Sequence, residues 1–271
     1  MSNTVCIKDY FNGFSSNYDK ENEKNYWRLS DEILWNHLIK RIKKSEFMFL
    51  DLGGGTGTWS KRILDMYPWS YGKLYDISDG MIDICKQKLK EYLNRVDIIK
   101  GDIIDIKSYG NADYIFLVYV LMFIKDQETA LLNAKKLIKD DGRIFFVVEN
   151  QLNGMAVNLL NDNVEEAICI YKNSYGSITE KVPKIYYNTI DNVKAMCERV
   201  GLEITYYAGF PVFTTIGVKR INDDKYRKMK YILSDEKKYK SILDIEKDLS
   251  SNQDLALRGK YILFEAKKRG K

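Results

Sequence analysis

The chain has 271 residues, of which 45% are hydrophobic and 30% are charged, a balance typical of a single globular α/β domain with a substantial core. Its net charge is +5, and because basic residues are interspersed with acidic ones, this charge does not favour a nucleic-acid partner. The four cysteines are scattered without a C-x-x-C pair, and no apolar run approaches about 18 residues, so we expect a cytoplasmic protein without structural zinc, disulfides or a membrane span.

The first 44 residues are predicted to form two helices, and the next hundred alternate between strand and helix. The two helices are expected at 10–27 and 30–44. Strands are predicted at 47–51, 72–76, 96–100, 112–118 and 143–149, with helices at 58–67, 79–93 and 127–138 and a turn at 140–142. Such alternation is typical of a parallel, doubly wound sheet that binds ligands at the carboxyl ends of its strands.

The pattern loosens after residue 150. Residues 151–185 mix helix-like and loop-like sequence and precede a predicted helix at 189–200. The next strand is predicted at 202–210 and the final strand at 259–267, with a charged, helix-prone stretch at 223–254 between them.

An acidic residue and three alternating glycines follow the first predicted strand, at Asp51, Gly53, Gly55 and Gly57. Glycine takes positive φ easily and lets a ligand approach the backbone closely. The spacing fits neither the dinucleotide fingerprint nor the phosphate loop, because the required glycines and the Gly-Lys pair are missing. It resembles motif I of the class I S-adenosylmethionine (SAM)-dependent methyltransferases, where the acid helps to hold the amino end of SAM and the glycines lie against its methionine and ribose. A tight turn without a ligand is the alternative.

Two further acids stand where this family has its next motifs. Asp76 ends the second strand and resembles the acid that binds both ribose hydroxyls, with Ile77 beside the adenine. Dinucleotide enzymes also have an acid here, and Asp76 could instead cap the following helix. Asp102 and Ile103 resemble the family's adenine clamp, with a solvent-facing turn as the alternative reading of Asp102.

The fourth strand and its continuation, which begin at Asp113, are similar to the family segment that passes under the methionine end of SAM. The resemblance places Leu117 and Tyr119 near the reacting centre. Phe123 stands where many relatives have a histidine. The N-P-P-Y motif of adenine and glutamine amide methyltransferases is absent, and no metal site is predicted.

The resemblance also implies a lid over the cofactor. A segment around Tyr18 is similar to one that precedes motif I in small-molecule members of the family, where a tyrosine covers the SAM pocket. Tyr26 and Arg28 are weaker lid candidates, and packing between the two helices would explain these aromatic residues equally well.

Methyl transfer from a sulfonium needs a well-placed acceptor and, where the acceptor must lose a proton, a base. Polar residues follow the fifth strand at the edge where acceptors bind in this fold. The candidates for orienting or deprotonating the acceptor are Glu149, Asn150, Tyr119 and, less favoured, the sole histidine, His37, which a structural role explains better. Tyr186 and Tyr187 are further tyrosines that could orient an acceptor.

Taken with the resemblance, these features predict one methyltransferase domain over 1–271: an N-terminal helical lid at 1–44, a SAM-binding core at 45–150 and substrate-cap insertions at 151–185 and 211–258. The fold implied is a Rossmann-like, doubly wound, mostly parallel seven-stranded sheet whose last two strands form a reversed hairpin. We expect methyl transfer from SAM to an O or N atom of a small organic metabolite, by a monomer or homodimer. The alternatives are an RNA or protein methyltransferase, suggested only by overall charge and the basic residues at 267–271, and a catalytically silent SAM-binding subunit.

Overall fold

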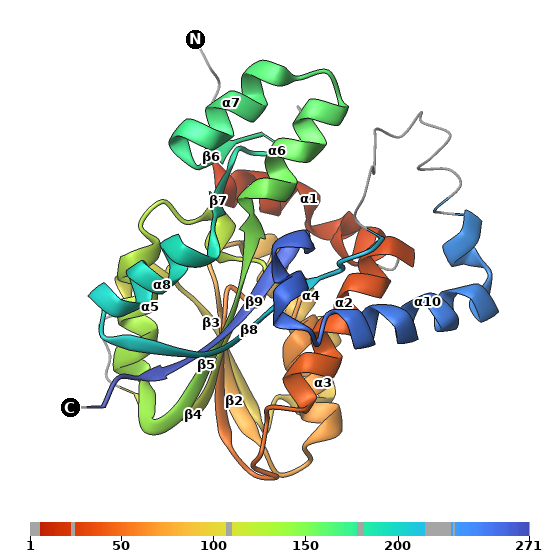
Figure 1. Ribbon diagram of the computed structural model, residues 1–271. Helices are drawn as coiled ribbons and strands as arrows, with labels where there is room; N and C mark the ends of the chain where they lie inside the picture. The colour runs from red at the N-terminus through yellow and green to blue at the C-terminus, as the bar shows by residue number, and fades with distance from the viewer. Residues whose placement is uncertain are drawn as a thin grey trace.

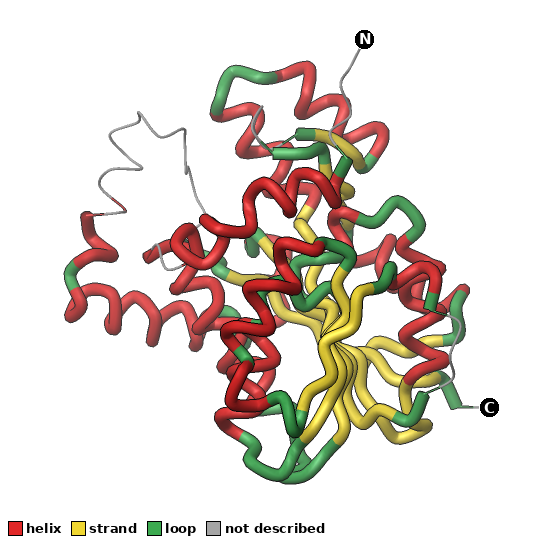
Figure 2. Tube along the Cα trace, turned by 180° about the vertical axis from the view of Figure 1, so that it is seen from behind, coloured by secondary structure: helices red, strands yellow, loops and turns green. Residues whose placement is uncertain are grey.

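A mixed sheet of nine strands forms the centre of the protein in a computed structural model that describes residues 6–22, 25–106, 110–177, 182–214, 229 and 231–270. Helices cover both faces of the sheet (Figure 1, Figure 2). Five strands run parallel in the order β3 (Val96–Lys100), β2 (Tyr71–Asp76), β1 (Met48–Leu52), β4 (Ala112–Leu117) and β5 (Ile138–Asn150). β9 (Tyr261–Lys268) lies antiparallel to β5, and β8 (Leu202–Phe210) lies antiparallel to β9. These seven strands form the predicted doubly wound sheet with its reversed hairpin.

The structure adds two short strands to the seven. β7 (Ile185–Asn188) pairs in parallel with the last two residues of β5, and β6 (Tyr175–Gly176) pairs antiparallel with β7. The mixed pattern of 151–185 had not indicated them. β5 also begins earlier than predicted, because Ile138 already pairs with Ala112. The expected turn at 140–142 is therefore an irregularity within this strand.

Alternate residues of the central strands feed two separate cores. Phe49, Phe116 and Phe145 face one side of the sheet, and Leu50, Ile115 and Phe146 face the other. The first core is closed by α2 (Asn25–Ile39), α3 (Thr58–Met66) and α4 (Asp79–Lys88). The second is closed by α5 (Gln127–Leu137) and α8 (Ile190–Arg199). Because helices cover both faces of these strands, residues that point to either face are apolar. The segments therefore appear in the sequence as continuous apolar runs.

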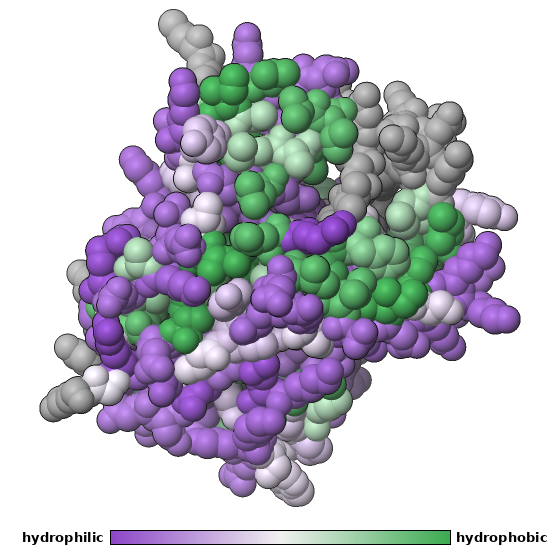
Figure 3. Space-filling view, viewed as in Figure 1, coloured by the Kyte–Doolittle hydropathy of each residue, from purple (hydrophilic) through white to green (hydrophobic). Residues whose placement is uncertain are grey.

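The remaining helices lie around the carboxyl ends of the parallel strands. They are α1 (Ile7–Asn22), α6 (Gln151–Leu160), α7 (Val164–Asn173) and α10 (Glu236–Leu249), with short 3-10 turns at η2 (Ile103–Asp105), η3 (Leu121–Phe123) and η4 (Gln253–Arg258). A further 3-10 turn, η1 (Lys90–Tyr92), precedes the amino end of β3. The predicted helix at 10–27 thus ends five residues early, and the second helix begins five residues before its predicted start. Figure 3 shows apolar side chains gathered over α6 and α7, where Leu152, Leu159, Val164 and Tyr171 are exposed.

The insertion between β8 and β9 is fixed by one buried carboxylate. Glu246 of α10 is fully buried and accepts hydrogen bonds from the backbone N–H groups of Val212, Phe213 and Thr214 and from the Thr214 hydroxyl. Because a buried carboxylate is costly unless it is fully hydrogen-bonded, these contacts hold α10 against the chain leaving β8. No helix within the described ranges is long and apolar enough to cross a membrane.

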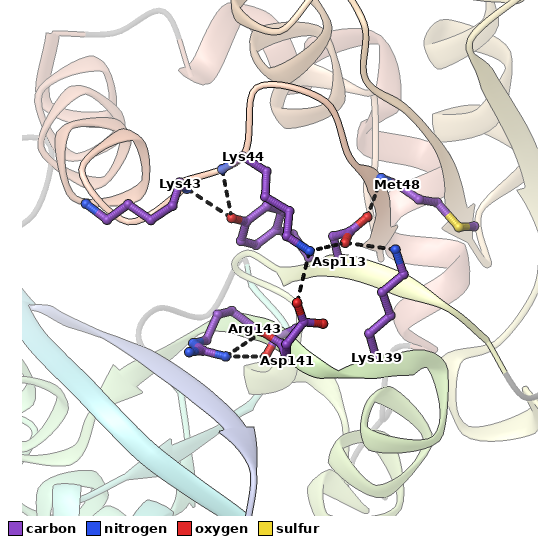
Figure 4. A network of polar contacts seen from close by, with 9 residues as sticks. Lys43, Lys44, Met48, Asp113, Lys139, Asp141 and Arg143 are labelled. Carbon is purple, nitrogen blue, oxygen red and sulfur yellow. Dashed lines mark hydrogen bonds and ion pairs between the residues drawn. The ribbon is translucent and has the colours of Figure 1, made fainter.

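Asp113 lies at the amino end of β4, on the edge of the sheet opposite to the carboxyl ends of the strands (Figure 4). Its carboxylate accepts hydrogen bonds from Lys44 Nζ at 2.6 Å, Lys139 Nζ at 2.9 Å and the Met48 backbone N–H at 2.9 Å. These three donors hold the pKa of Asp113 below its usual range despite its burial. Asp113 therefore ties β1, β4 and β5 together at this edge.

Candidate cofactor and active site

A cavity of about 390 Å³ opens at the carboxyl ends of β1, β2 and β4. Its walls come from the loops that follow these strands and from α1, which lies across it. This is the place where open α/β sheets bind ligands, and the volume lies in the range of small-molecule sites. The residues that line it include eight of the eleven predicted cofactor residues: Tyr18, Gly53, Gly55, Asp76, Ile77, Asp102, Ile103 and Tyr119.

The glycine turn forms one wall of the cavity because its backbone adopts conformations that other residues avoid. Gly53 and Gly55 have φ of 76° and 55°. The N–H groups of Gly53 and Gly54 donate to the Tyr75 carbonyl, which joins the turn to β2. A Cβ at Gly53 would lie 2.4 Å from the Val120 side chain. The turn is thus packed against the segment after β4 and leaves bare backbone toward the cavity.

Asp76 stands at the junction between the glycine turn and β2. One carboxylate oxygen accepts from the Gly55 N–H at 2.8 Å and the other accepts from the Ser78 N–H at 2.8 Å. Burial raises the pKa of Asp76, although these backbone donors oppose the change. The cap of α4 is Ser78, whose hydroxyl accepts from the Met81 N–H, so the alternative reading of Asp76 as the helix cap is not what the structure has.

Asp102 both caps a 3-10 turn and lines the cavity. Its side chain accepts from the Ile104 N–H at 3.0 Å and so caps η2, and it also lines the cavity together with Ile103. Ile77 lies on the same side and is 37% exposed.

Helix α1 is joined to the core by polar contacts on both sides of the cavity. The Asn12 side-chain oxygen accepts from the Ser78 hydroxyl at 2.7 Å, and Asp19 accepts from the Thr56 hydroxyl at 2.7 Å and from Lys88 Nζ at 2.8 Å. Its aromatic residues face inward, where the Phe11 ring meets the Phe123 ring edge to face at 5.0 Å and Tyr18 lines the cavity. Phe123 thus packs under α1.

Three predicted cofactor residues are not among the lining residues. The Asp51 carboxyl is buried beneath the glycine turn, where it accepts from the Ser60 hydroxyl at 2.7 Å, and burial raises its pKa to about 6. A Cβ at Gly57 would meet Cys85 and Leu89, so this glycine serves close packing with α4. Leu117 is fully buried in the core on the α5 side of the sheet.

Of the four predicted catalytic residues, only Tyr119 lines the cavity. Two of the others, His37 and Asn150, are held by hydrogen bonds elsewhere. His37 is buried, its two ring nitrogens lie 2.9 Å from the Ser250 hydroxyl and 3.0 Å from the Tyr206 hydroxyl, and burial lowers its pKa to about 4. Asn150 donates to the carbonyls of Leu257 and Gly259 and caps α6. Their hydrogen bonds give both residues structural roles.

Tyr119 lines the other end of the cavity, and Glu149 lies near it in a buried cluster that does not itself line the cavity. Tyr119 follows β4 with a left-handed backbone, φ 57°, and its ring lies 4.8 Å from the Tyr261 ring. Glu149, on β5 beside Tyr261 of β9, is buried, and burial raises its pKa to about 7 although Lys260 opposes this. Tyr187 of β7 pairs with Glu149 across the sheet, whereas Tyr186 contacts Tyr175.

The structure brings residues into this cluster that the sequence reasoning missed. Asp31 of α2 is 7% exposed, faces the Tyr119 hydroxyl, and has a pKa raised by burial to about 7. Lys260 Nζ lies 4.2 Å from the centre of the Trp27 ring. Asp31 could have been noticed, because it stands three residues before Leu34 and seven before Leu38, on the buried stripe of its helix. Of the lid candidates, Tyr26 lies in this region, near Glu149, and Arg28 instead pairs with Glu236 of α10 at 3.2 Å.

Metal ligands are the remaining question for a site rich in acids. Among the described residues, no group of three or more histidine, cysteine, aspartate or glutamate side chains is placed to hold a metal ion.

Comparison with known proteins identifies the family. Residues 50–144 match the family described as a methyltransferase domain. The chain is 21% identical over 245 residues to a malonyl-[acyl-carrier protein] O-methyltransferase of Priestia megaterium, covering 83% of this chain and 85% of the relative. It is 29% identical to a demethylmenaquinone methyltransferase of Chlamydia pneumoniae, over 53% of this chain and 61% of the relative.

The solved structures agree with the fold. A putative methyltransferase in complex with the Haloferax volcanii Trm112 methyltransferase activator superposes with a TM-score of 0.64 at 14% identity, over 98% of this chain and 99% of that one. Other structures of this fold were solved with SAH, the demethylated form of SAM. SAM is the cofactor, and the chain belongs to the class I SAM-dependent methyltransferases.

Proposed function

We propose that this enzyme transfers the methyl group of SAM to an O or N atom of a small organic molecule. The observation that carries the proposal is the cavity itself, which joins the Asp76 end, suited to a ribose, to the Tyr119 end, where buried polar groups converge. SAM lying along this wall would place its adenosine by Asp76 and Asp102 and its sulfonium near Tyr119. Asp51 would act on the amino end only through the turn or through water, since it does not line the cavity.

The surroundings of the Tyr119 end favour a small acceptor. Tyr119, Glu149 and Tyr261 lie beneath α2, and α1 lines the cavity from above. A flat nucleic-acid or protein surface would not reach buried atoms here, whereas a small molecule could be enclosed. The name of the second relative, a demethylmenaquinone methyltransferase, supports the same class. In this proposal α1 and α2 act as the lid, and α6, α7 and α10 as the cap over the acceptor.

The chemistry follows from this geometry. The methyl carbon of SAM carries a good leaving group, so the protein supplies orientation, exclusion of water and a destination for any proton that the acceptor loses. Orientation of this kind contributes up to about 7–11 kcal/mol to barrier lowering.

Calorimetry with SAM and with SAH tests the cofactor site. We expect the Asp76→Ala variant to bind both ligands about 100-fold more weakly, because two charge-assisted hydrogen bonds to the ribose would be lost. Asp79→Ala is the matched control, since Asp79 lies three residues away on the exposed first turn of α4, paired with Lys100. Equal affinities in wild type and Asp76→Ala would refute the placement of the ribose.

A further inference from the structure

Three buried polar atoms at the Tyr119 end of the site lack a hydrogen-bond partner within the described chain: the Tyr119 hydroxyl, the Tyr187 hydroxyl and one Glu149 carboxylate oxygen. More than nine-tenths of buried polar groups in proteins are satisfied, so such a concentration needs an explanation. All three come from segments that end at the carboxyl edge of the sheet. They are therefore placed to bind a polar ligand rather than to stabilise the fold.

Tyr119 is the member of this set that reaches the cavity. Its left-handed backbone, unusual for a tyrosine, turns the chain at the end of β4 so that the residue lines the cavity while its hydroxyl points into the buried cluster. The rings of Trp59 at 6.4 Å and Tyr261 at 4.8 Å flank it. These aromatic contacts hold the Tyr119 ring in place.

Asp31 faces this hydroxyl from α2. Charge and hydrogen bonding between the two groups shift the pKa of each, although the contact falls outside strict hydrogen-bond geometry. The other groups near Asp31 are Arg62 on α3, Glu32 on α2 and Tyr261 on β9. Arg62 is already paired with Glu32 at 2.8 Å. Active-site hydrogen bonds are often long in the absence of substrate and tighten when it binds.

We propose that Asp31 and Tyr119 act as a pair that binds a hydroxyl acceptor and takes up its proton, so that the enzyme is an O-methyltransferase of alcohols or phenols. This inference rests on the proposed function. In the step, the acceptor oxygen forms a bond to the methyl carbon and the carbon–sulfur bond breaks, with its electron pair going to sulfur. The acceptor proton passes by way of the Tyr119 hydroxyl to the Asp31 carboxylate, leaving a methyl ether, SAH and a protonated Asp31.

The charges of the cluster separate hydroxyl acceptors from the other classes. Arg62 near Asp31 is already paired with Glu32, and Lys260 offsets one of the two carboxyl groups, so a carboxylate acceptor would add a further negative charge to a cluster in which Asp31 and Glu149 outnumber the remaining cation. An amine would be held by these carboxyl groups as its ammonium form, which has no lone pair to attack with, and a carboxylate with a pKa near 7 cannot readily deprotonate a group with a pKa near 10. A hydroxyl loses its proton easily once the oxygen bears the methyl group, so the same carboxylate suffices.

Methyl transfer from tritiated SAM to four one-ring probes tests the pair: phenol, 4-nitrophenol, benzoate and benzylamine. We expect wild type to methylate phenol and not benzoate or benzylamine. Asp31→Asn and Tyr119→Phe should lower kcat on phenol about 100-fold while SAH affinity changes less than about 2-fold. With 4-nitrophenol, which is largely ionised at neutral pH, Asp31→Asn should lose less than about 10-fold. The double variant should be no worse than the more damaged single variant.

Matched controls separate a functional role from damage to the fold. Asp65→Asn alters an exposed acid that accepts from the Tyr92 hydroxyl, and Ser70→Ala removes another buried hydroxyl without a partner in the described chain, just before the amino end of β2. Both should leave turnover unchanged. Equal losses of Asp31→Asn on phenol and 4-nitrophenol would overturn the proton-accepting role. Transfer to benzoate or benzylamine alone, or none to phenol by protein that binds SAH, would overturn the hydroxyl assignment.

A measurement without turnover gives a second check on the same pair. In carbon-13 spectra of the SAH complex, Asp31→Asn should remove one aspartate carboxyl signal that titrates near neutral pH, and Tyr119→Phe should shift the midpoint of that signal. Spectra without such a signal would contradict the inference. Protein that binds neither SAM nor SAH would instead refute the proposed function, so the two failures are distinguishable.

Discussion

The two edges of the parallel sheet treat their carboxyl groups in opposite ways. At the amino edge, Asp113 is buried but receives three donors, two of them lysines, and its pKa is held low. At the carboxyl edge, Asp31 and Glu149 are equally buried, are not ion-paired within the described chain, and have pKa values raised by burial. Buried carboxyl groups are thus fully paired at the amino edge and lack ion-pair partners at the carboxyl edge.

This difference separates stability from function. A buried, fully paired carboxylate strengthens the fold, whereas a buried, unpaired one weakens it and persists where a reaction needs it. The two edges therefore respond to mutation and to pH with opposite signs, and each of the following experiments tests that contrast.

The largest effect is expected at the amino edge. Asp113→Asn should lower the free energy of unfolding by about 2–3 kcal/mol at pH 7, because Lys44 and Lys139 lose their shared partner. Because the folded pKa of Asp113 is depressed, this stabilisation is present above the unfolded pKa near 3.9 and is lost as pH falls through the folded value. Denaturant unfolding at pH 7 and pH 3 measures it. The control is Asp141→Asn, an exposed acid on the same Lys44, which should cost less than about 0.5 kcal/mol.

A change of opposite sign is expected at the carboxyl edge. Asp31→Asn should raise the free energy of unfolding by roughly 1–3 kcal/mol above pH 7, because an ionised buried carboxylate is removed. The folded pKa is raised to about 7, so the wild type is relatively most stable below the unfolded pKa and loses stability as pH rises toward 7. The difference between the two proteins should vanish near pH 3.5. A destabilised Asp31→Asn at pH 8 would remove the contrast between the edges.

The smallest effect concerns the contact between α1 and the glycine turn. Asp19→Asn weakens the hydrogen bonds from the buried Thr56 and the partly exposed Lys88, so SAM should dissociate about 3-fold faster, a change below about 1 kcal/mol. Stopped-flow release of SAM measures this rate. Asp9→Asn, an exposed acid on the first turn of the same helix, should leave the rate unchanged.

The sequence was most informative where the local backbone or the local burial restricts which residue types are allowed. Apolar runs and glycine spacing placed the strands and the turn, because burial on both faces and positive φ each restrict the residues allowed. The position of Asp76 beside the turn followed from its place at the end of β2. The short strands β6 and β7 could not be predicted, because they exist only through pairing with β5, a long-range contact that leaves no periodic pattern.

The buried polar cluster around Tyr119 was harder to predict from the sequence, because it also depends on long-range contacts. Tyr119 and Glu149 were expected at the carboxyl edge, but Asp31 enters from α2 and Tyr261 from β9, which are brought together only by tertiary packing. His37 was considered as a base because histidine often acts as one. Its contacts with the Ser250 and Tyr206 hydroxyls could not be predicted, because these residues lie far from it in the sequence. Asp113 was counted with the cofactor motifs, and the structure puts it at the opposite edge.

Strand β4 sets the distance between the two edges. From Asp113 to the end of the strand at Leu117 there are four residue steps, or about 13 Å at about 3.3 Å per residue, and Tyr119 lies beyond that end. Sites this far apart that share no partner among the described residues seldom couple. Substitutions at the two edges should therefore be additive within about 0.5 kcal/mol. A new acid in the acceptor site would lower stability, and a substitution at the amino edge could restore that stability without changing what the enzyme methylates. The fold is therefore tolerant of changes in substrate.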